Sequence, residues 1–438
     1  MKKKMVVLSE DALADVDMGY LSALPNFERY IKGGATVKNF RSVFPTITYI
    51  DHTSMITGCY PDKHGVLSND AFRPGDTDAP WNWFASVIKC EDVFTAAKRG
   101  GYSTASVFWP VTGNHKSIDY LIDEIWKHGE IDTNKEALRR SGTSDELMRE
   151  VVEPNMFLFP DRTMPPMCVH PNIDTFILNC AVEIIERYKP DLCMLHPAQI
   201  DAAKHGHSIT GEHIDRAIEE ADKHIGMIGR ALEKADILDE TDFILISDHG
   251  QREFGCWFFP HTEFIKRGII KAEDGVLKDW DAWVSSQGFS GLVYLKNPSD
   301  KAVYHRVYET LCYFKELGIV SDIYDGEKLE KQHLGKNISF AFETNQSFGI
   351  STSLASTTLV KPSYDETRGH IKTDACHGYS AMLPPYPVFY AKGPSFVDGA
   401  VRETASLVDL APTIAEIFDF KLSVDGKVMS DLLKKQGK

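Results

Sequence analysis

A set of aspartate and histidine side chains in this chain has the composition of a metal site. Carboxylate and imidazole ligands together suit Zn²⁺, and Mn²⁺ is a possible substitute. Each of these residues lies at the end of an expected strand or in the loop that follows one. Two divalent ions and one activated hydroxyl are enough to displace a group at phosphorus. The predicted ligands are Asp11, Asp201, His205, Asp248, His249 and His377.

The hydroxyl in this pattern belongs to Thr48, the first residue of an expected helix that ends at Gly58. A threonine hydroxyl is a poor nucleophile when protonated, but coordination to a metal lowers its pKa. Free N–H groups at a helix N-terminus also favour an anion. Three aspartates and two divalent ions leave about one positive charge, which suits a singly charged phosphodiester better than a dianionic monoester. Threonine is also favoured as a helix N-cap, and that interpretation is the alternative for Thr48.

The spacing of the ligands is weak evidence in each fragment and stronger when the fragments are taken together. Asp201 and His205 are four residues apart, and Asp248-His249-Gly250 follows an expected buried strand. Glycine at the last position lets the backbone turn sharply beside an ion. A single Asp-His-Gly is usually a turn, and a single Asp-x-x-x-His is usually a solvated helix face. Their occurrence after successive strands favours the metal site.

Apolar runs alternate with segments of helical period along the chain, which predicts an α/β fold. We expect a doubly wound, mostly parallel sheet with helices on both faces, and an active site at the carboxyl edge of the strands. The expected strands are Met5–Leu8, Thr104–Phe108, Leu192–Leu195, Phe243–Ile246, Gly291–Leu295 and Val388–Tyr390. The expected helices are Thr48–Thr57, Glu212–Leu232 and Ala405–Phe418.

Two stretches interrupt this alternation. Gly113–Pro171 is charged and then rich in proline and methionine, and the stretch from about Gly255 to Thr373 has strand and helix signals of its own. We interpret both as insertions on one core. Residues 1–438 are therefore predicted to be a single catalytic domain, with residues 255–373 as a cap-like subdomain.

The composition limits the partners and the cellular location. Of the 438 residues, 43% are hydrophobic and 25% charged, and the net charge of −15 disfavours a nucleic acid duplex as partner. The eight cysteines are scattered, which argues against a disulfide framework. The apolar run Met5–Leu8 is too short for a signal core, and no window reaches the ~20 apolar residues of a membrane span. We expect a cytoplasmic protein without a membrane partner. The oligomeric state cannot be predicted.

Several segments resemble the alkaline phosphatase superfamily, and in particular its nucleotide pyrophosphatase/phosphodiesterase branch. Val6–Asp11 resembles the opening strand and aspartate of the superfamily. Phe44–His52 resembles the nucleophile segment of the branch, and Thr57–Val66 resembles the TG-x-YP-x-x-HG stretch that follows. Later matches occur in the same order, at Asp201–His207, Ser247–Gly250, Cys376–Tyr379 and Val408–Ile414.

The resemblance implies an alkaline-phosphatase-like core and two zinc ions. It implies that Asp201, His205 and His377 bind one ion, and that Asp11, Asp248 and His249 bind the other with Thr48 as a further ligand. It also implies that Asn69 contacts a phosphate oxygen, although Ser68-Asn69-Asp70 could simply be a turn.

This chain departs from the family pattern at two positions beside the ligands. Asp51 replaces the usual asparagine and would add negative charge near Thr48 if it faces inward. Lys204 replaces a glycine and could screen that charge or bind substrate. Trp109 could line the pocket or belong to the core. His370 is the main rival to His377 as a ligand, but Gly378 and Tyr379 after His377 favour His377.

The leading functional prediction is a two-zinc hydrolase of small phosphodiesters or nucleotide pyrophosphates that forms a phospho-threonine intermediate. One alternative is a phosphonate hydrolase similar to phosphonoacetate hydrolase. An alternative from another class is a non-catalytic, metal-loaded binder of phosphorylated ligands. The sequence does not distinguish the leaving group.

Overall fold

The computed structural model describes residues 2–129, 133–159, 172–206, 208–363 and 374–435. Within them, eight strands form one large sheet in the order β19-β2-β18-β6-β1-β5-β3-β4. The strands are β1 (Lys4–Ser9), β2 (Ala35–Arg41), β3 (Thr104–Val107), β4 (Tyr120–Ile122), β5 (Leu192–Leu195), β6 (Thr241–Ile246), β18 (Phe389–Lys392) and β19 (Val401–Ser406).

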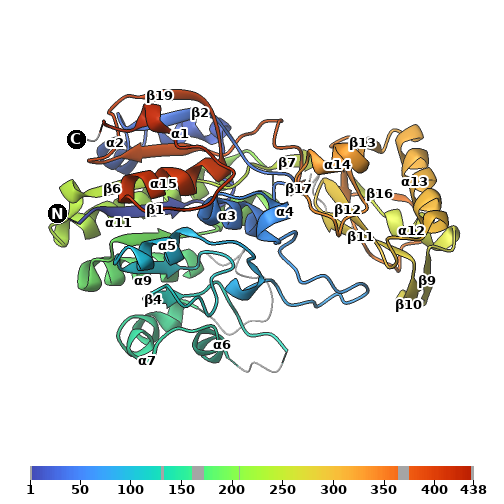
Figure 1. The fold of residues 1–438 in the computed structure, drawn as a ribbon, viewed down its shortest axis with the longest axis horizontal. Coiled ribbons are helices and arrows are strands. Elements are labelled where there is room, and N and C mark those ends of the chain that lie inside the picture. Colours follow the sequence, from blue (N-terminus) through green and yellow to red (C-terminus); the bar gives the residue numbers. More distant parts are fainter. Residues whose placement is uncertain (1, 130–132, 160–171, 207, 364–373, 436–438) are drawn as a thin grey trace.

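The sheet is mostly parallel, with β1 in its interior (Figure 1). β1 pairs in parallel with β5 and with β6, so that Val7 lies opposite Met194 on one side and Ile244 on the other. β18 runs antiparallel to both of its neighbours, β2 and β6. Both faces of a parallel sheet are buried, so helices must pack against each face of this one. The predicted fold class is confirmed.

The side chains of β1 alternate between two hydrophobic clusters. Val6 and Leu8 belong to the cluster under one set of helices, and Met5 and Val7 belong to the cluster under the other. The first set is α1 (Met18–Leu21), α2 (Pro25–Tyr30), α9 (Asn172–Tyr188), α10 (Gln199–Gly206) and α11 (Glu212–Lys234). The second set is α3 (Thr48–Thr57), α5 (Val93–Arg99) and α15 (Leu410–Phe418).

The predicted helix Ala405–Phe418 is wrong in its first part. Its start belongs to β19, which pairs in parallel with β2, and a 3₁₀ turn at Leu407–Asp409 follows. The Asp409 side chain accepts a hydrogen bond from the Ser406 N–H, so α15 begins only after this turn. Pro412 then falls in the first turn of α15, where it removes no helical hydrogen bond.

The interpretation of residues 113–171 as an insertion is also wrong in part. β4 lies within this stretch and pairs in parallel with β3, so it is the edge of the main sheet. Buried residues of α6 and α7 join the cluster that includes α9 and α11. The helices of this stretch are α6 (Asn134–Arg140), α7 (Asp145–Leu147) and α8 (Glu153–Asn155).

A second lobe stands beside the carboxyl end of β1 (Figure 1). It holds a four-stranded antiparallel sheet, in the order β11-β12-β14-β13, with its own hydrophobic cluster. The predicted strand Gly291–Leu295 is the core of β12 and therefore lies in this lobe, outside the main sheet. The four strands are β11 (Ala282–Gln287), β12 (Ser290–Leu295), β13 (Val320–Tyr324) and β14 (Phe340–Thr344).

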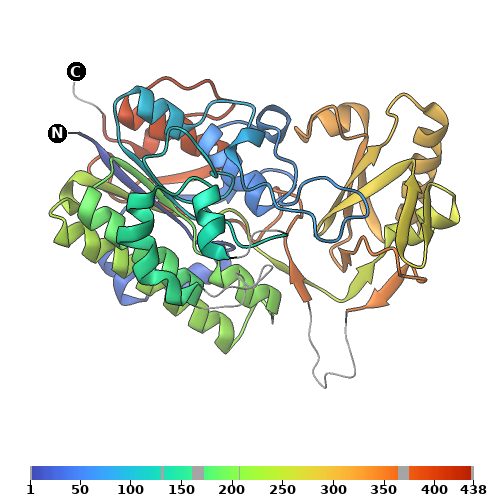
Figure 2. The ribbon, with the colours of Figure 1, turned by 90° about the horizontal axis from the view of Figure 1, so that it is seen from below.

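Smaller elements complete the lobe and link it to the core, and Figure 2 shows the two parts from below. The antiparallel pair of β7 and β17 lies at the link. A cap-like role of the lobe stays a prediction. The remaining elements are α4 (Pro61–His64), β7 (Arg252–Phe254), β8 (Cys256–Phe258), α12 (Pro260–Lys266), β9 (Ile270–Glu273), β10 (Val276–Trp280), α13 (Lys301–Glu316), α14 (Gly326–Glu330), β15 (Phe348–Ile350), β16 (Val360–Pro362) and β17 (Asp374–Cys376).

Candidate metal centre

Three neighbouring parallel strands bring five of the six predicted aspartate and histidine ligands to one edge of the sheet, and His377 reaches it from the end of β17. Asp11 follows the end of β1, and Asp248 and His249 follow the end of β6. Asp201 lies in α10, which begins four residues after β5 ends. Because β1 lies between β5 and β6, the side chains of Asp11 and its neighbours converge at this edge.

The first cluster consists of Asp11, Asp248 and His249, all buried. The Nε2 atom of His249 lies 3.3 Å from Asp248 Oδ2 and 3.6 Å from Asp11 Oδ1. Among the described residues, Asp11 Oδ1 and Asp248 Oδ2 have no hydrogen-bond partner. Burial without partners is costly for carboxylate oxygens, so these atoms fit the ligand shell of a cation.

The second cluster consists of Asp201, His205 and His377. Asp201 Oδ1 lies 3.4 Å from His205 Nε2 and 4.0 Å from His377 Nε2. The rings of His377 and His249 are stacked with their centroids 3.9 Å apart, so the two clusters are in direct contact. The structure thus brings all six predicted aspartate and histidine residues into two adjoining groups.

Two of the histidines are held by main-chain oxygens on the side away from the clusters. His205 Nδ1 lies 2.8 Å from Ala375 O, and His377 Nδ1 lies 2.9 Å from Thr46 O. A carbonyl can only accept, so Nδ1 carries the proton in both rings. The Nε2 lone pairs then face Asp201, which is the arrangement found in metal-binding histidines.

The electrostatics of the clusters favour divalent cations. Burial raises the pKa of Asp11 well above its ordinary value, and the nearby carboxylates of Asp248 and Asp201 raise it further. Burial also holds the pKa of His249 well below its ordinary value, and His377 adds to the effect. A divalent ion would be attracted by the crowded carboxylates and would accept the neutral imidazoles. The residues therefore fit a metal pair.

Thr48 is the first residue of α3 and faces the first cluster. Its Oγ1 atom lies 3.2 Å from His249 Nε2, and its side chain is buried. Ile47 occupies the N-cap position, so the N-cap interpretation of Thr48 does not hold. The hydroxyl is placed where it could join the metal ligands.

Asn69 lies beside Thr48 through a hydrogen bond to the next peptide group. Its Oδ1 atom accepts from the Tyr49 N–H at 3.0 Å, which satisfies one of the free N–H groups of the first turn of α3. The amide Nδ2 group is then left to donate elsewhere. The turn interpretation of Asn69 is incomplete, because the side chain is hydrogen-bonded to the first turn of α3.

Two further histidines lie behind the first cluster. His52 belongs to the segment that resembles the family's nucleophile segment, but the sequence predicted no role for it. His196 was not among the predicted site residues. His52 Nδ1 lies 2.8 Å from Thr48 O and its Nε2 lies 3.0 Å from Ser9 Oγ, while His196 Nε2 lies 3.3 Å from Asp11 Oδ2. Burial lowers the pKa of each of these two histidines to about 3, so both rings are neutral at physiological pH.

The ligand atoms of His52, His196 and Asp248 lie within 4.8 Å of one another. Both nitrogens of His52 are, however, already engaged by Thr48 and Ser9, which makes this group a support for the cluster. The signal that could have found His196 is its position directly after β5, the same rule that selected Asp11 and Asp248.

The two residues that depart from the family pattern are both buried and bonded to other protein groups. Asp51 is fully buried and accepts hydrogen bonds from Ser42 Oγ at 2.6 Å and Val43 N at 3.3 Å. Burial raises the pKa of Asp51 well above its ordinary value, with a further contribution from Asp248. Lys204 neither pairs with Asp51 nor reaches the surface, because its ammonium group contacts Ala12 and Asp17.

Trp109, a possible pocket residue, and His261 lie in the protein interior, and two further histidines lie outside the described residues. Trp109 is fully buried, and its ring lies 4.8 Å from that of His52, so it belongs to the core. His261 packs within the second lobe, where Nδ1 lies 3.0 Å from Thr352 O. His207 and His370 lie outside the described residues.

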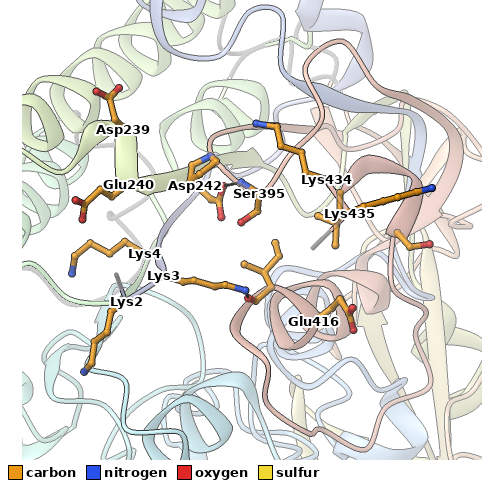
Figure 3. Close-up of a pocket in the computed structure, with 14 residues that line it drawn as sticks. Lys2, Lys3, Lys4, Asp239, Glu240, Asp242, Ser395, Glu416, Lys434 and Lys435 are labelled. Carbon is orange, nitrogen blue, oxygen red and sulfur yellow. Dashed lines mark hydrogen bonds between the residues drawn. The ribbon is translucent and has the colours of Figure 1, made fainter. Parts of the chain in front are cut away.

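A pocket at the opposite edge of the sheet does not resemble a phosphate site (Figure 3). Lysines at the start of β1 line it together with Asp239, Glu240 and Asp242. Lys4 Nζ is bonded to Lys189 O at 2.7 Å and to Asp191 at 3.2 Å. The ammonium groups of Lys2, Lys3 and Lys4 are therefore already engaged by carbonyl or carboxylate oxygens.

The fold is an α/β sheet of the alkaline-phosphatase type, and the paired clusters are groups of residues that could hold metal ions. The sequence profile of the family described as "Type I phosphodiesterase / nucleotide pyrophosphatase" matches residues 5–373. The chain belongs to this family, whose members are hydrolytic enzymes. The predicted family is thereby confirmed.

Two relatives show how distant the similarity is. Venom phosphodiesterase 2 of Crotalus adamanteus is 22% identical over 250 residues, which cover 54% of this chain and 26% of the relative. Human ectonucleotide pyrophosphatase/phosphodiesterase family member 1 is 23% identical over 238 residues, which cover 53% of this chain and 22% of the relative. The chain thus spans about a quarter of the length of these curated relatives.

Solved structures show the same fold along the whole chain. Murine ectonucleotide pyrophosphatase/phosphodiesterase 5 superposes with a TM-score of 0.67 at 18% identity, covering 99% of this chain and 100% of that chain. An inactive threonine-to-alanine form of the murine protein in complex with AMP gives a TM-score of 0.68 at 17% identity, with the same coverage.

None of the described helices in the present chain is both long and apolar enough to cross a membrane.

Proposed function

We propose that this chain is a two-zinc hydrolase of small phosphodiesters or nucleotide pyrophosphates, with Thr48 as the nucleophile. The observation that carries the proposal is the position of Thr48 Oγ1, 3.2 Å from His249 Nε2 at the junction of the two clusters. Family membership supports the reaction class. The AMP complex of the murine relative supports a nucleotide as part of the substrate.

Divalent ions held by the two clusters would supply Lewis acidity, lowering the pKa of the Thr48 hydroxyl and offsetting negative charge on the substrate. Thr48 gives its hydroxyl proton to solvent, and Oγ1 attacks phosphorus to form a phospho-threonine. The ester bond to the leaving group breaks in the same step, and the departing oxygen takes a proton from water when it leaves as an alcohol. Water then cleaves the new bond and regenerates the hydroxyl. The hydrogen bonds of His205 to Ala375 O and of His377 to Thr46 O keep both Nε2 atoms pointed into the site throughout.

The charge of the site predicts a preference for diesters. Asp11, Asp201 and Asp248 with two divalent ions leave about one positive charge, and ionised Thr48 cancels it. A bound diester then leaves the site with a net charge of about −1, whereas a bound dianionic monoester leaves about −2, which a buried site disfavours more strongly. We expect bis(p-nitrophenyl) phosphate to be hydrolysed with a kcat/KM at least ~10-fold above that of p-nitrophenyl phosphate, and a chelator to abolish both activities until Zn²⁺ is restored.

The measurement is turnover of both substrates by the zinc-loaded protein, followed by competition among a dinucleotide, a glycerophosphodiester and phosphonoacetate at equal concentration. Zinc-loaded protein without turnover would refute the enzyme and support the binder. Selective turnover of phosphonoacetate would replace the diesterase with a phosphonate hydrolase. Chelator-resistant turnover would refute the metal requirement.

Asn69 is expected to donate from Nδ2 to a non-bridging phosphate oxygen. Removing a donor of this kind costs about 10²- to 10³-fold in kcat. Asn69→Ala should therefore lower kcat on that scale. Asn69→Asp is the matched variant, because it keeps an acceptor for the Tyr49 N–H but loses the amide donor.

Both variants of Asn69 should lose kcat, but only Asn69→Ala should also lower the thermal unfolding midpoint. A kcat for Asn69→Asp close to that of the unmodified protein would show that the donor is not used.

A further inference from the structure

A buried lysine lies between two of the metal-cluster residues on the same short helix. Lys204 is in α10, three residues after Asp201 and one before His205. Its side chain is only 2% exposed. The ammonium group donates to Ala12 O at 2.8 Å and to Asp17 Oδ2 at 2.7 Å. Lys204 is therefore directed into the protein, toward the loop after β1.

Ala12 joins that loop to the other cluster. It follows Asp11 directly and has a φ of 58°, a left-handed conformation that non-glycine residues adopt only when their surroundings enforce it. Its N–H donates to Asp248 Oδ1 at 3.1 Å, while its carbonyl accepts from Lys204. The backbone of Ala12 thus connects the cluster of Asp248 with the helix that carries Asp201.

Asp17 lies at the other end of the loop that follows β1 and contacts both that loop and Lys204. It is buried, and its Oδ2 atom accepts from the Ala14 N–H at 2.9 Å as well as from Lys204. A buried ion pair is an inefficient way to add stability, because desolvation of both charges offsets most of the attraction. Such a pair, fully hydrogen-bonded beside a metal centre, instead restricts the loop to one arrangement.

We infer that Lys204 and Asp17, together called the Lys204–Asp17 clamp, set the separation of the two metal subsites. Lys204 is a positioning residue, since it touches no reacting atom. The inference rests on the proposed two-metal function and adds a residue to it. The clamp fixes α10, with Asp201 and His205, against the loop that carries Asp11.

The other contacts of α10 hold it to different parts of the protein. Gln251 Nε2 donates to the main-chain oxygen of Asp201 at 3.1 Å, and His205 Nδ1 is held by Ala375 of β17. Neither contact involves the loop after β1. The Asp11 N–H also donates to Pro197 O at 3.1 Å, two residues before α10 begins, so this bond holds only the start of the helix. Without the clamp, the part of α10 that carries Lys204 and His205 would lose its direct contact with the loop after β1 and could shift relative to Asp11. A displacement of about 1 Å between reacting groups costs about 10²-fold in rate.

The test is the double variant Lys204→Met with Asp17→Asn. It removes both charges together, so no unpaired charge is buried, and the new amide oxygen can still accept from the Ala14 N–H. Zinc affinity is measured by calorimetry, and kcat and KM are measured with a diester at saturating zinc. We expect the second zinc equivalent to bind at least ~10-fold more weakly and kcat to fall ~10- to 100-fold, with KM little changed.

The matched control is Lys223→Met, which removes an exposed lysine on α11 that pairs with Glu220. It should leave zinc affinity and kcat unchanged. A clamp that merely stabilised the fold would lower the unfolding midpoint of the double variant while leaving kcat at saturating zinc unchanged, and that result would overturn the inference.

If the double variant does not fold, Asp17→Asn alone decides, since it keeps the hydrogen-bond acceptors and removes one charge. Weaker binding of the second zinc equivalent supports the clamp, and unchanged binding overturns it. Absence of zinc binding in the unmodified protein would overturn the proposed function and the clamp together. Normal zinc binding and turnover in every variant would overturn the clamp alone.

Discussion

Replacing Thr48 by alanine should abolish turnover of diesters while leaving the metal content unchanged. The hydroxyl is the one protein group in the proposed mechanism that forms a bond to phosphorus, and removing a nucleophile lowers kcat by about 10⁴- to 10⁶-fold. The two clusters retain their aspartates and histidines in this variant. We therefore expect two equivalents of zinc by elemental analysis and a kcat at the background rate.

A matched threonine on the same helix provides the control. The Oγ1 atom of Thr53 donates to Tyr49 O, four residues earlier in α3, and Thr53 is likewise buried. Thr53→Ala should therefore keep kcat within a few-fold. Acid quenching of the unmodified protein during turnover should trap a phosphoryl group on Thr48, detected by mass spectrometry. Near-normal turnover by Thr48→Ala, or a phosphoryl group on another residue, would refute the nucleophile assignment.

The central part of the fold was predictable because its signals are local. β5 and α3 have the predicted bounds, since a short apolar run in one case and a terminal glycine in the other mark their ends. Gly58, which ends α3, has a φ of 64° and occupies the left-handed position that terminates many helices. β19 was missed because its burial comes from its partner β2, which the local sequence does not reveal.

The clustering of the predicted ligands could be foreseen for a related reason. Residues after the carboxyl ends of parallel strands meet at one edge of the sheet. The proximity of Asp11 and Asp248 could therefore be predicted from their strand positions alone. His377 lies beyond the second lobe, and only its resemblance to the family motif indicated it. Its ring nevertheless stacks on that of His249 at 3.9 Å.

The supporting residues could not be assigned from the sequence. A histidine or lysine in a buried position has no local pattern that distinguishes support from ligation. Substrate binding was one of the predicted roles of Lys204, because it lies between two predicted ligands in the sequence. Its side chain instead points into the protein, and its ammonium group donates to Ala12 O and Asp17. His196 likewise gains its place beside Asp11 only through the pairing of β5 with β1.

Replacing Asp248 by asparagine should remove one zinc ion and nearly all activity. Asp248 Oδ1 already accepts from the N–H groups of Ala12 and His249, at 3.1 and 2.9 Å, and an amide oxygen can keep both bonds. The change therefore acts mainly through Oδ2, which has no hydrogen-bond partner among the described residues. A bound metal supplies several kcal/mol of transition-state stabilisation, so we expect kcat to fall by about 10³-fold or more.

Asp239→Asn is the control for Asp248→Asn, because Asp239 is an exposed acid just before β6, at the opposite end of the strand that positions Asp248. The control should retain two zinc equivalents and normal turnover. In Asp248→Asn, elemental analysis should find one equivalent, and added zinc should restore little activity, because a neutral amide is a weak ligand for this ion. Two tightly bound equivalents in the variant would place Asp248 outside the metal shell. The carboxylate would then be only a hydrogen-bond acceptor that fixes the loop after β1, and Asp11 and His249 would need another partner at the first subsite.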